Sequence, residues 1–80
     1  MSTSAVKVEP LAVDVSCTDT GLRVVLADGR EIVTPLEWFP RLRDARPEQR
    51  ANWRPIGGGV GIHWPDLDED ISVAGLLATR

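Results

Sequence analysis

The sequence predicts one small α+β domain, a small antiparallel sheet in the order β-β-β-α-β-β-α with helices covering one face. Three observations support this prediction. The 80 residues, 42% hydrophobic and 26% charged, suffice for one globular domain and are too few for two. The first half alternates apolar and polar residues with the period of half-buried strands, and prolines divide the second half into short elements. We expect residues 1–7 to be a disordered N-terminus and residues 8–80 to form the single domain.

Three strands are expected to open the domain. Residues 11–18 alternate apolar with polar side chains, which turns Cys17 toward the core. A turn leads into a strand at residues 22–26, and Asp28-Gly29 predicts a two-residue type I′ hairpin before a third strand at residues 30–34. The sheet face that needs apolar cover carries Val13, Val15, Leu22, Val24, Leu26 and Ile32.

Prolines control the segment that follows the third strand. Residues 36–39 are expected to form a helical turn, and residues 40–45 a short helix with Pro40 in its first turn. Pro47 prevents one long helix, so residues 47–51 are at most a second short helical turn. The apolar side chains available here to cover the sheet are Trp38, Phe39 and Leu42.

A glycine run separates two further strands. Residues 53–56 and 60–64 are expected to pair across a hairpin made by Gly57-Gly58-Gly59. On the second of these strands, Val60, Ile62 and Trp64 share one face. Trp64 therefore points into the core, and His63 points away from it.

The last element is expected to be a helix from Asp66 to about Ala78. Its apolar residues at positions 67, 71, 74 and 77 follow helical spacing. Asp66 with Glu69 three residues later resembles a capping box, and acids in a first helical turn face free backbone N–H groups. This places Asp68, Glu69 and Asp70 at the start of the helix.

The charge of the chain limits the classes of partner. The net charge is −3, and residues 57–80 hold four acidic residues against Arg80 as their one base. Nucleic-acid binding requires a basic surface, so we do not expect it, whereas an acidic surface suits a basic protein. The one cysteine, the absence of a signal-peptide core and the lack of a long apolar run favour a cytoplasmic protein without a membrane segment.

A metal site is the first chemical alternative. Asp66, Asp68 and Asp70 have the opening spacing of a calcium-binding EF-hand, but that loop needs glycine and glutamate where Ile71 and Leu77 stand. A different site, built from His63, Asp66 and Asp68, is chemically compatible with a divalent ion and remains open. The helix-cap interpretation of the acids competes with it.

Catalysis is not expected. His63 is the one histidine, and the hydroxyl-bearing residues show no catalytic spacing. The glycines at positions 57, 58, 59 and 61 lead into a strand rather than a helix, so they do not resemble a phosphate-binding loop. The sequence therefore predicts no enzyme, no catalytic residues and no cofactor.

Arginines form the basic feature of the chain. Arg41, Arg43, Arg46, Arg50 and Arg54 are interleaved with Trp53, which leaves contact with nucleic acid as an alternative, although Asp44 and Glu48 dilute the charge. A second alternative is contact between this segment and the acidic Asp66–Asp70 turn, within one molecule or head-to-tail between two.

Three runs carry a resemblance to a known family. Residues 35–42, 47–53 and 59–73 resemble the bacterial family called domain of unknown function 2442, and the likeness covers essentially the whole chain. The resemblance implies a small cytoplasmic α+β domain without established enzymatic activity. Some relatives carry a fused helix-turn-helix segment, for which this chain, ending at Arg80, leaves no room. Many relatives appear beside domain of unknown function 4160, in pairs proposed to act like toxin and antitoxin.

Together, these observations predict a non-enzymatic protein-interaction domain, the antitoxin-like or neutralising member of a two-protein bacterial module. The expected partner is a small basic protein encoded nearby, and a homodimer is a second option. Two alternatives stay open, a nucleic-acid-associated regulatory domain and a small metal- or ligand-binding protein. The candidate partner-binding residues are His63, Asp66, Asp68, Glu69, Asp70, Arg43, Arg50 and Arg54.

Overall fold

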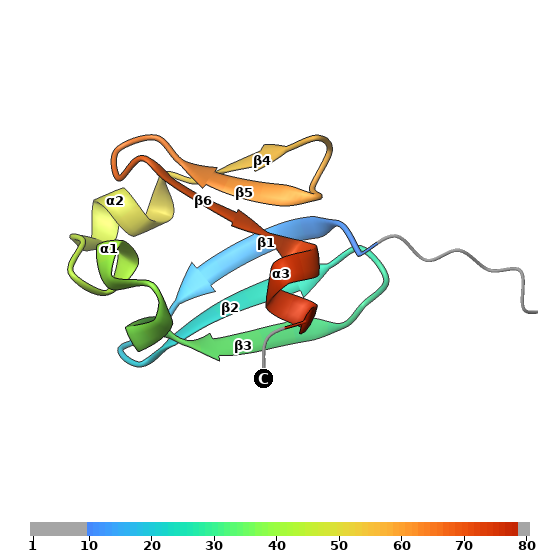
Figure 1. Ribbon diagram of the computed structural model, residues 1–80, viewed down its shortest axis with the longest axis horizontal. Coiled ribbons are helices and arrows are strands. Elements are labelled where there is room, and N and C mark those ends of the chain that lie inside the picture. Colours follow the sequence, from blue (N-terminus) through green and yellow to red (C-terminus); the bar gives the residue numbers. More distant parts are fainter. Residues whose placement is uncertain (1–9, 79–80) are drawn as a thin grey trace, which may run out of the picture.

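A computed structural model describes residues 10–78 of the chain (Figure 1). The disorder expected for residues 1–7 lies outside the described residues. The elements follow one another as three strands, three short helical segments, three further strands and a final helix. The predicted α+β class is confirmed, with the strands divided between two three-stranded antiparallel sheets.

The first sheet contains β1 (Ala12–Cys17), β2 (Gly21–Leu26) and β3 (Glu31–Pro35), with β2 in the centre. The pairing of β1 with β2 shifts register between Ala12 and Asp14. This bulge turns Ala12 and Val15 inward together and leaves Val13 56% exposed. The prediction that Val13 belongs to the core is therefore wrong, because one extra residue changes the phase of the alternation.

The loop between β2 and β3 also differs from the prediction. A type I′ hairpin needs positive φ at both central residues, but here only Gly29 has one, at 93°. Gly29 N–H donates to Leu26 O, and Leu26 N–H donates to Arg30 O. These bonds close a three-residue loop in which glycine takes the left-handed position.

The helical segments after β3 lie close to the positions that were predicted from the prolines. They are a 3₁₀ turn (Leu36–Trp38), α1 (Pro40–Arg43) and α2 (Pro47–Ala51). Both α-helices begin with proline, whose missing N–H costs nothing in a first turn. Leu36 and Leu42 are buried, whereas Trp38 is 43% exposed and α2 buries no residue.

The second sheet contains β4 (Arg54–Ile56), β5 (Gly61–Trp64) and β6 (Glu69–Ser72), with β5 in the centre. The predicted hairpin of Gly57, Gly58 and Gly59 is confirmed, since all three have positive φ. Pro55 lies in the middle of the edge strand β4 and provides no N–H donor. Val60 falls in the turn and is 51% exposed, which corrects its placement on the core face.

The acidic segment forms a turn and a strand instead of the start of a helix. Residues 65–68 turn the chain, with Asp68 at a positive φ of 50°, and β6 then pairs with β5. The last helix, α3 (Val73–Ala78), begins seven residues later than predicted and has no acid in its first turn. Pairing with β5 outweighs the local helical spacing, because Ile71 gains a buried place opposite Ile62.

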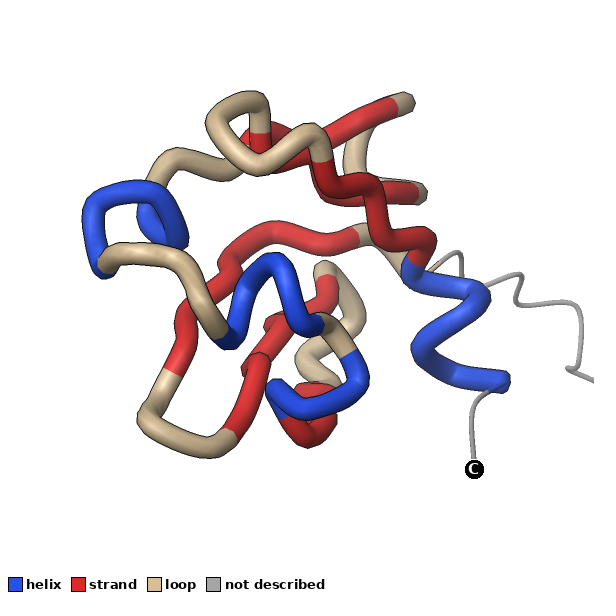
Figure 2. Tube along the Cα trace, turned by 60° about the vertical axis from the view of Figure 1, so that its left-hand side comes forward, coloured by secondary structure: helices blue, strands red, loops and turns tan. Residues whose placement is uncertain are grey.

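The two sheets share one hydrophobic core. Figure 2 shows the second sheet lying over the first, with the short helices after β3 on one side and α3 on the other. Trp64 and Ile62 are fully buried, as predicted, and α3 adds Val73 and Leu76 while Leu77 stays exposed. None of the described helices has the length and apolar character to cross a membrane. The complete set of buried apolar residues is Ala12, Val15, Leu22, Val24, Leu26, Leu36, Leu42, Ile62, Trp64, Ile71, Val73 and Leu76.

One backbone hydrogen bond joins the two sheets: Ala12 N–H donates to Gly59 O over 2.8 Å. A second bond, from Val73 N–H to Val60 O over 3.0 Å, continues the β5–β6 pairing by one residue and holds the start of α3 to the second sheet. Gly59 has no side chain, and a Cβ there would lie 2.8 Å from Ala12 O. The close approach of β1 to the glycine hairpin therefore depends on glycine at this position.

Candidate functional site

The outer face of the second sheet carries a row of three charged or polar side chains. The strand register aligns Arg54 with His63 and His63 with Asp70, one residue from each strand. His63 Nδ1 contacts Asp70 Oδ1. His63 is half-buried and points away from the core, as the sequence predicted, while Arg54 and Asp70 are exposed. No described helix or strand covers this face (Figures 1 and 2).

The acidic turn borders this face. Asp66 Oδ2 accepts a hydrogen bond of 3.1 Å from Asn52 Nδ2, and the backbone oxygen of Asp68 accepts one of 2.7 Å from Arg41 Nη1. Within residues 10–78, no carboxylate of Asp66, Asp68, Glu69 or Asp70 forms an ion pair with lysine or arginine. The helix cap that the sequence predicted for these acids is absent. Asp66, Asp68 and Asp70 are exposed, whereas Glu69 is half-buried opposite Trp64, on the face of β6 that also carries Ile71.

The structure does not assemble the metal site that the sequence left open. His63 turns to Asp70, and Asp66 turns to Asn52. Across the described part of the chain, no three histidine, cysteine, aspartate or glutamate side chains gather closely enough to hold an ion. His63, Asp66 and Asp68 are therefore not brought together as a ligand set.

Neighbouring acids engage part of the arginine segment. Arg43 pairs with Asp44 at 2.9 Å and Arg46 with Glu48 at 3.5 Å, all of them exposed. Within residues 10–78, this segment contacts the acidic turn through two hydrogen bonds: Arg41 donates to the backbone oxygen of Asp68, and Asn52 donates to the carboxylate of Asp66. None of its arginines reaches a carboxylate of the turn. The arginines do not lie along one helix, because α1 ends before α2 begins. This confirms the prediction made from Pro47.

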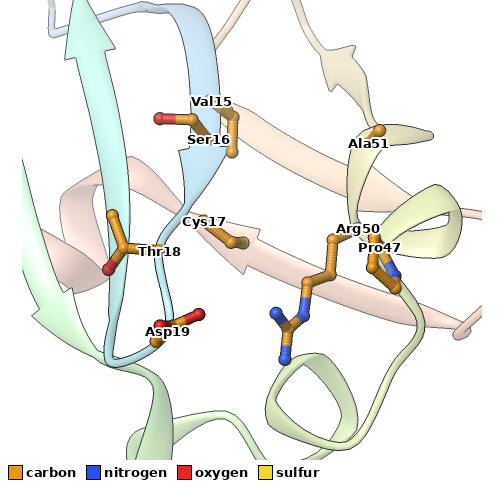
Figure 3. A pocket seen from close by; sticks show the side chains of 8 residues that line it. All are labelled: Val15, Ser16, Cys17, Thr18, Asp19, Pro47, Arg50 and Ala51. Carbon is orange, nitrogen blue, oxygen red and sulfur yellow. The ribbon is translucent and has the colours of Figure 1, made fainter.

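A groove that sequence reasoning missed lies between β1 and α2. Its volume is about 360 Å³. In Figure 3 the Cys17 and Arg50 side chains approach it from opposite sides, with Asp19 on the β1 side. Its lining is formed by Val15, Ser16, Cys17, Thr18, Asp19, Pro47, Arg50 and Ala51. No local pattern marks these residues, which come from two segments about thirty positions apart and meet only through the fold.

Arg50 fixes the α2 side of the groove. Its Nε donates to Leu42 O over 2.8 Å and its Nη2 donates to Arg43 O over 2.6 Å, at the C-terminal end of α1. The backbone oxygen of Arg50 accepts from Trp64 Nε1 at 3.0 Å. Within residues 10–78 no carboxylate pairs with the Arg50 guanidinium, which is held by backbone carbonyls alone.

Cys17 lines the β1 side of the groove. Partial burial raises the pKa of its thiol, and the nearby Arg50 charge acts in the opposite direction but is the smaller effect. A thiol held in its protonated form is a poor nucleophile. Cys17 therefore acts as a small apolar lining residue of the groove, next to the core as predicted.

Comparison with known proteins places this geometry in a family. A crystal structure of a protein of unknown function from Rhodospirillum rubrum ATCC 11170 is similar, with a TM-score of 0.72 and 30% sequence identity. The similarity covers 88% of this chain and 87% of that one. None of the curated proteins shows a significant match. A family profile matches residues 12–80, and the chain therefore belongs to the family described as Protein of unknown function (DUF2442).

Proposed function

We propose that this chain is a non-enzymatic protein-interaction domain that binds a basic protein through the outer face of its second sheet. The supporting observation is the combination of an uncovered sheet face, the Arg54–His63–Asp70 row and a bordering turn of carboxylates without arginine or lysine partners among the described residues. Such a surface attracts a positively charged partner and sets its orientation.

Apolar contact area accompanies the charge. Ile56 is 42% exposed and stands on the same face as Arg54 and His63, and Gly61 lies beside Ile56 without a side chain of its own. Gly61 is itself buried, so the exposed part of Ile56 is the apolar surface that a partner can contact. Interfaces commonly place such an apolar centre inside a charged rim.

The expected partner is a small basic protein encoded next to this chain. The specific role that we propose is to neutralise that protein in the bacterial cytoplasm. The family resemblance supports this form, because many relatives occur in such pairs. Charge complementarity with the acidic turn supports the same assignment.

The test is co-expression with the adjacent gene product, followed by pull-down and titration calorimetry at two salt concentrations. We expect a complex that weakens as salt rises, because exposed charges are screened. The triple variant Asp66→Asn/Asp68→Asn/Asp70→Asn should weaken binding about tenfold or more, as loss of several rim charges does. Asparagine tolerates the left-handed backbone at position 68.

The control variant is Glu31→Gln, which removes an exposed carboxylate that pairs with Arg23 on the other sheet. It should bind like the natural chain. His63→Ala should fold normally and bind more weakly, since His63 lies on the outer face. Absence of any complex, or equal binding by the triple variant, would overturn the proposal. Salt-sensitive retention on DNA without protein binding would support the nucleic-acid alternative instead.

A further inference from the structure

The free edge of β1 carries backbone groups without partners. Thr18 N–H donates to Gly21 O and closes the β1–β2 hairpin. In an antiparallel ladder, hydrogen-bonded pairs alternate with non-bonded pairs, so Cys17 and Val15 fall at the non-bonded positions opposite Leu22 and Val24. Their N–H and C=O groups therefore point away from β2, and no backbone hydrogen bond to another described residue engages them.

The groove lies along this edge. Helix α2 stands opposite β1 without burying a side chain, and the hydrogen bonds of Arg50 to α1 and Trp64 hold it in place. The space between them is therefore kept open by polar contacts rather than filled by apolar packing. A volume of about 360 Å³ lies within the range of pockets that bind ligands.

The two sides of the groove specify the chemistry of an occupant. An open strand edge pairs with an extended chain, which supplies the matching N–H and C=O groups. The Arg50 guanidinium lies on the other side without a carboxylate among the described residues. Its Nε and one Nη2 hydrogen are used by the carbonyls of α1, so the two Nη1 hydrogens and the second Nη2 hydrogen remain to bind a carboxylate. Asp19, on the β1 side, disfavours a second acid near the hairpin (Figure 3).

We infer that the groove between β1 and α2 binds an extended peptide segment of a partner protein, which adds a strand to β1 and places one carboxylate against Arg50. The paired stretch, from Val15 to Cys17, is short and spans roughly 7 Å of strand. This groove is a second surface of the interaction domain proposed above and rests on that function, but it lies on other elements than the outer face of the second sheet.

The experiment selects peptides from a display library of random heptapeptides with the whole chain as bait. We expect enrichment of sequences with one aspartate or glutamate among β-branched residues. The best peptide should shift the amide resonances of Val15 and Cys17. It should also slow alkylation of Cys17 by iodoacetamide at least threefold, and Cys17 is the one cysteine of the chain.

Matched variants separate groove binding from other binding. Ala51→Phe fills the groove from an exposed position of α2, and Ala74→Phe makes the same change at an exposed position of α3. The first should lower peptide affinity at least tenfold, and the second should leave it unchanged. Peptides N-methylated at one residue at a time should lose binding at alternate positions, because only every second N–H of a paired strand points to β1. An acid-to-amide change in the peptide should also weaken it.

Three outcomes would overturn the inference: no enriched sequence, enriched sequences without an acidic residue, or equal binding to the Ala51→Phe variant. The test is independent of the outer face. The triple aspartate variant should still select the same peptides, and Ala51→Phe should still bind the basic partner. If only the peptide selection fails, the groove proposal falls and the proposed function is unaffected. If only the binding of the basic partner fails, the proposed function falls and peptide binding by the groove can still be observed.

Discussion

At the scale of single residues, Trp64 connects the core to the groove. Its side chain is fully buried, and its indole N–H is satisfied by the backbone oxygen of Arg50. Buried tryptophan needs such a partner, because an indole N–H without one costs free energy in an apolar interior. The position of α2, and with it the width of the groove, is thus tied to the packing of one core side chain.

Replacing this side chain tests its contribution. Trp64→Ala should lower the free energy of unfolding by about 3–5 kcal/mol, the cost expected for removing a large buried aromatic. Urea denaturation measures the change. Trp38→Ala is the control, since Trp38 is 43% exposed and should cost less than about 1 kcal/mol. Equal effects of the two substitutions would show that Trp64 is a surface contact residue.

At the scale of elements, the β4–β5 hairpin connects the two sheets through Gly59. Of its three glycines, Gly58 has open space around the position of a Cβ, whereas a Cβ at Gly59 would lie 2.8 Å from Ala12 O and 3.0 Å from Ala12 N. The hairpin therefore needs glycine at the two positions for different reasons. Gly58 serves the turn, and Gly59 also permits the approach of β1.

Alanine substitutions distinguish these reasons. Gly58→Ala should cost about 1 kcal/mol, the strain of placing alanine at a positive φ. Gly59→Ala should cost about 3 kcal/mol, because strain adds to the loss of the Ala12 N–H bond to Gly59 O. Thermal denaturation of the two variants checks the order. Equal costs would mean that β1 can move away from the hairpin freely.

Some of these elements could be predicted from the sequence and others could not. Pro40, Pro47 and the glycine run act through their own backbone, so the helix starts and the hairpin follow from local chemistry. Strand β6 does not follow from local chemistry. It forms because it pairs with β5, and this pairing directs Asp70 outward and Ile71 inward. The alternation from Asp70 to Val73 was visible, yet the helical spacing of the same segment competed with it.

The two candidate surfaces, the outer face of the second sheet and the groove, were also predictable only in part. The outward direction of His63 followed from strand alternation alone and is confirmed. Its alignment with Arg54 and Asp70 depends on the register of three strands, which no local pattern gives. The groove depends on how far α2 stands from β1, and that distance is set by the Arg50 and Trp64 hydrogen bonds.

At the scale of the whole molecule, the described residues unfold as one unit if the shared core holds both sheets together. Native-state hydrogen exchange tests this. The amide of Ala12, which links the first sheet to the glycine hairpin of the second, should be as protected as those of the central strands β2 and β5. The amide of Asn52, bonded to Gln49 O beside exposed α2, should exchange much faster through local opening. Exchange of Ala12 at least tenfold faster than β2 would mean that the sheets separate before they unfold.

Pro55 adds a consequence for the behaviour of the protein in concentrated solution. An edge strand with free N–H groups can recruit identical edges into fibres, and proline in the middle of β4 removes a donor from that edge. The second sheet should therefore resist end-to-end growth along β4 when the chain is overproduced. Samples kept at high concentration should stay free of fibrils that bind thioflavin, and Pro55→Val should make such fibrils more frequent.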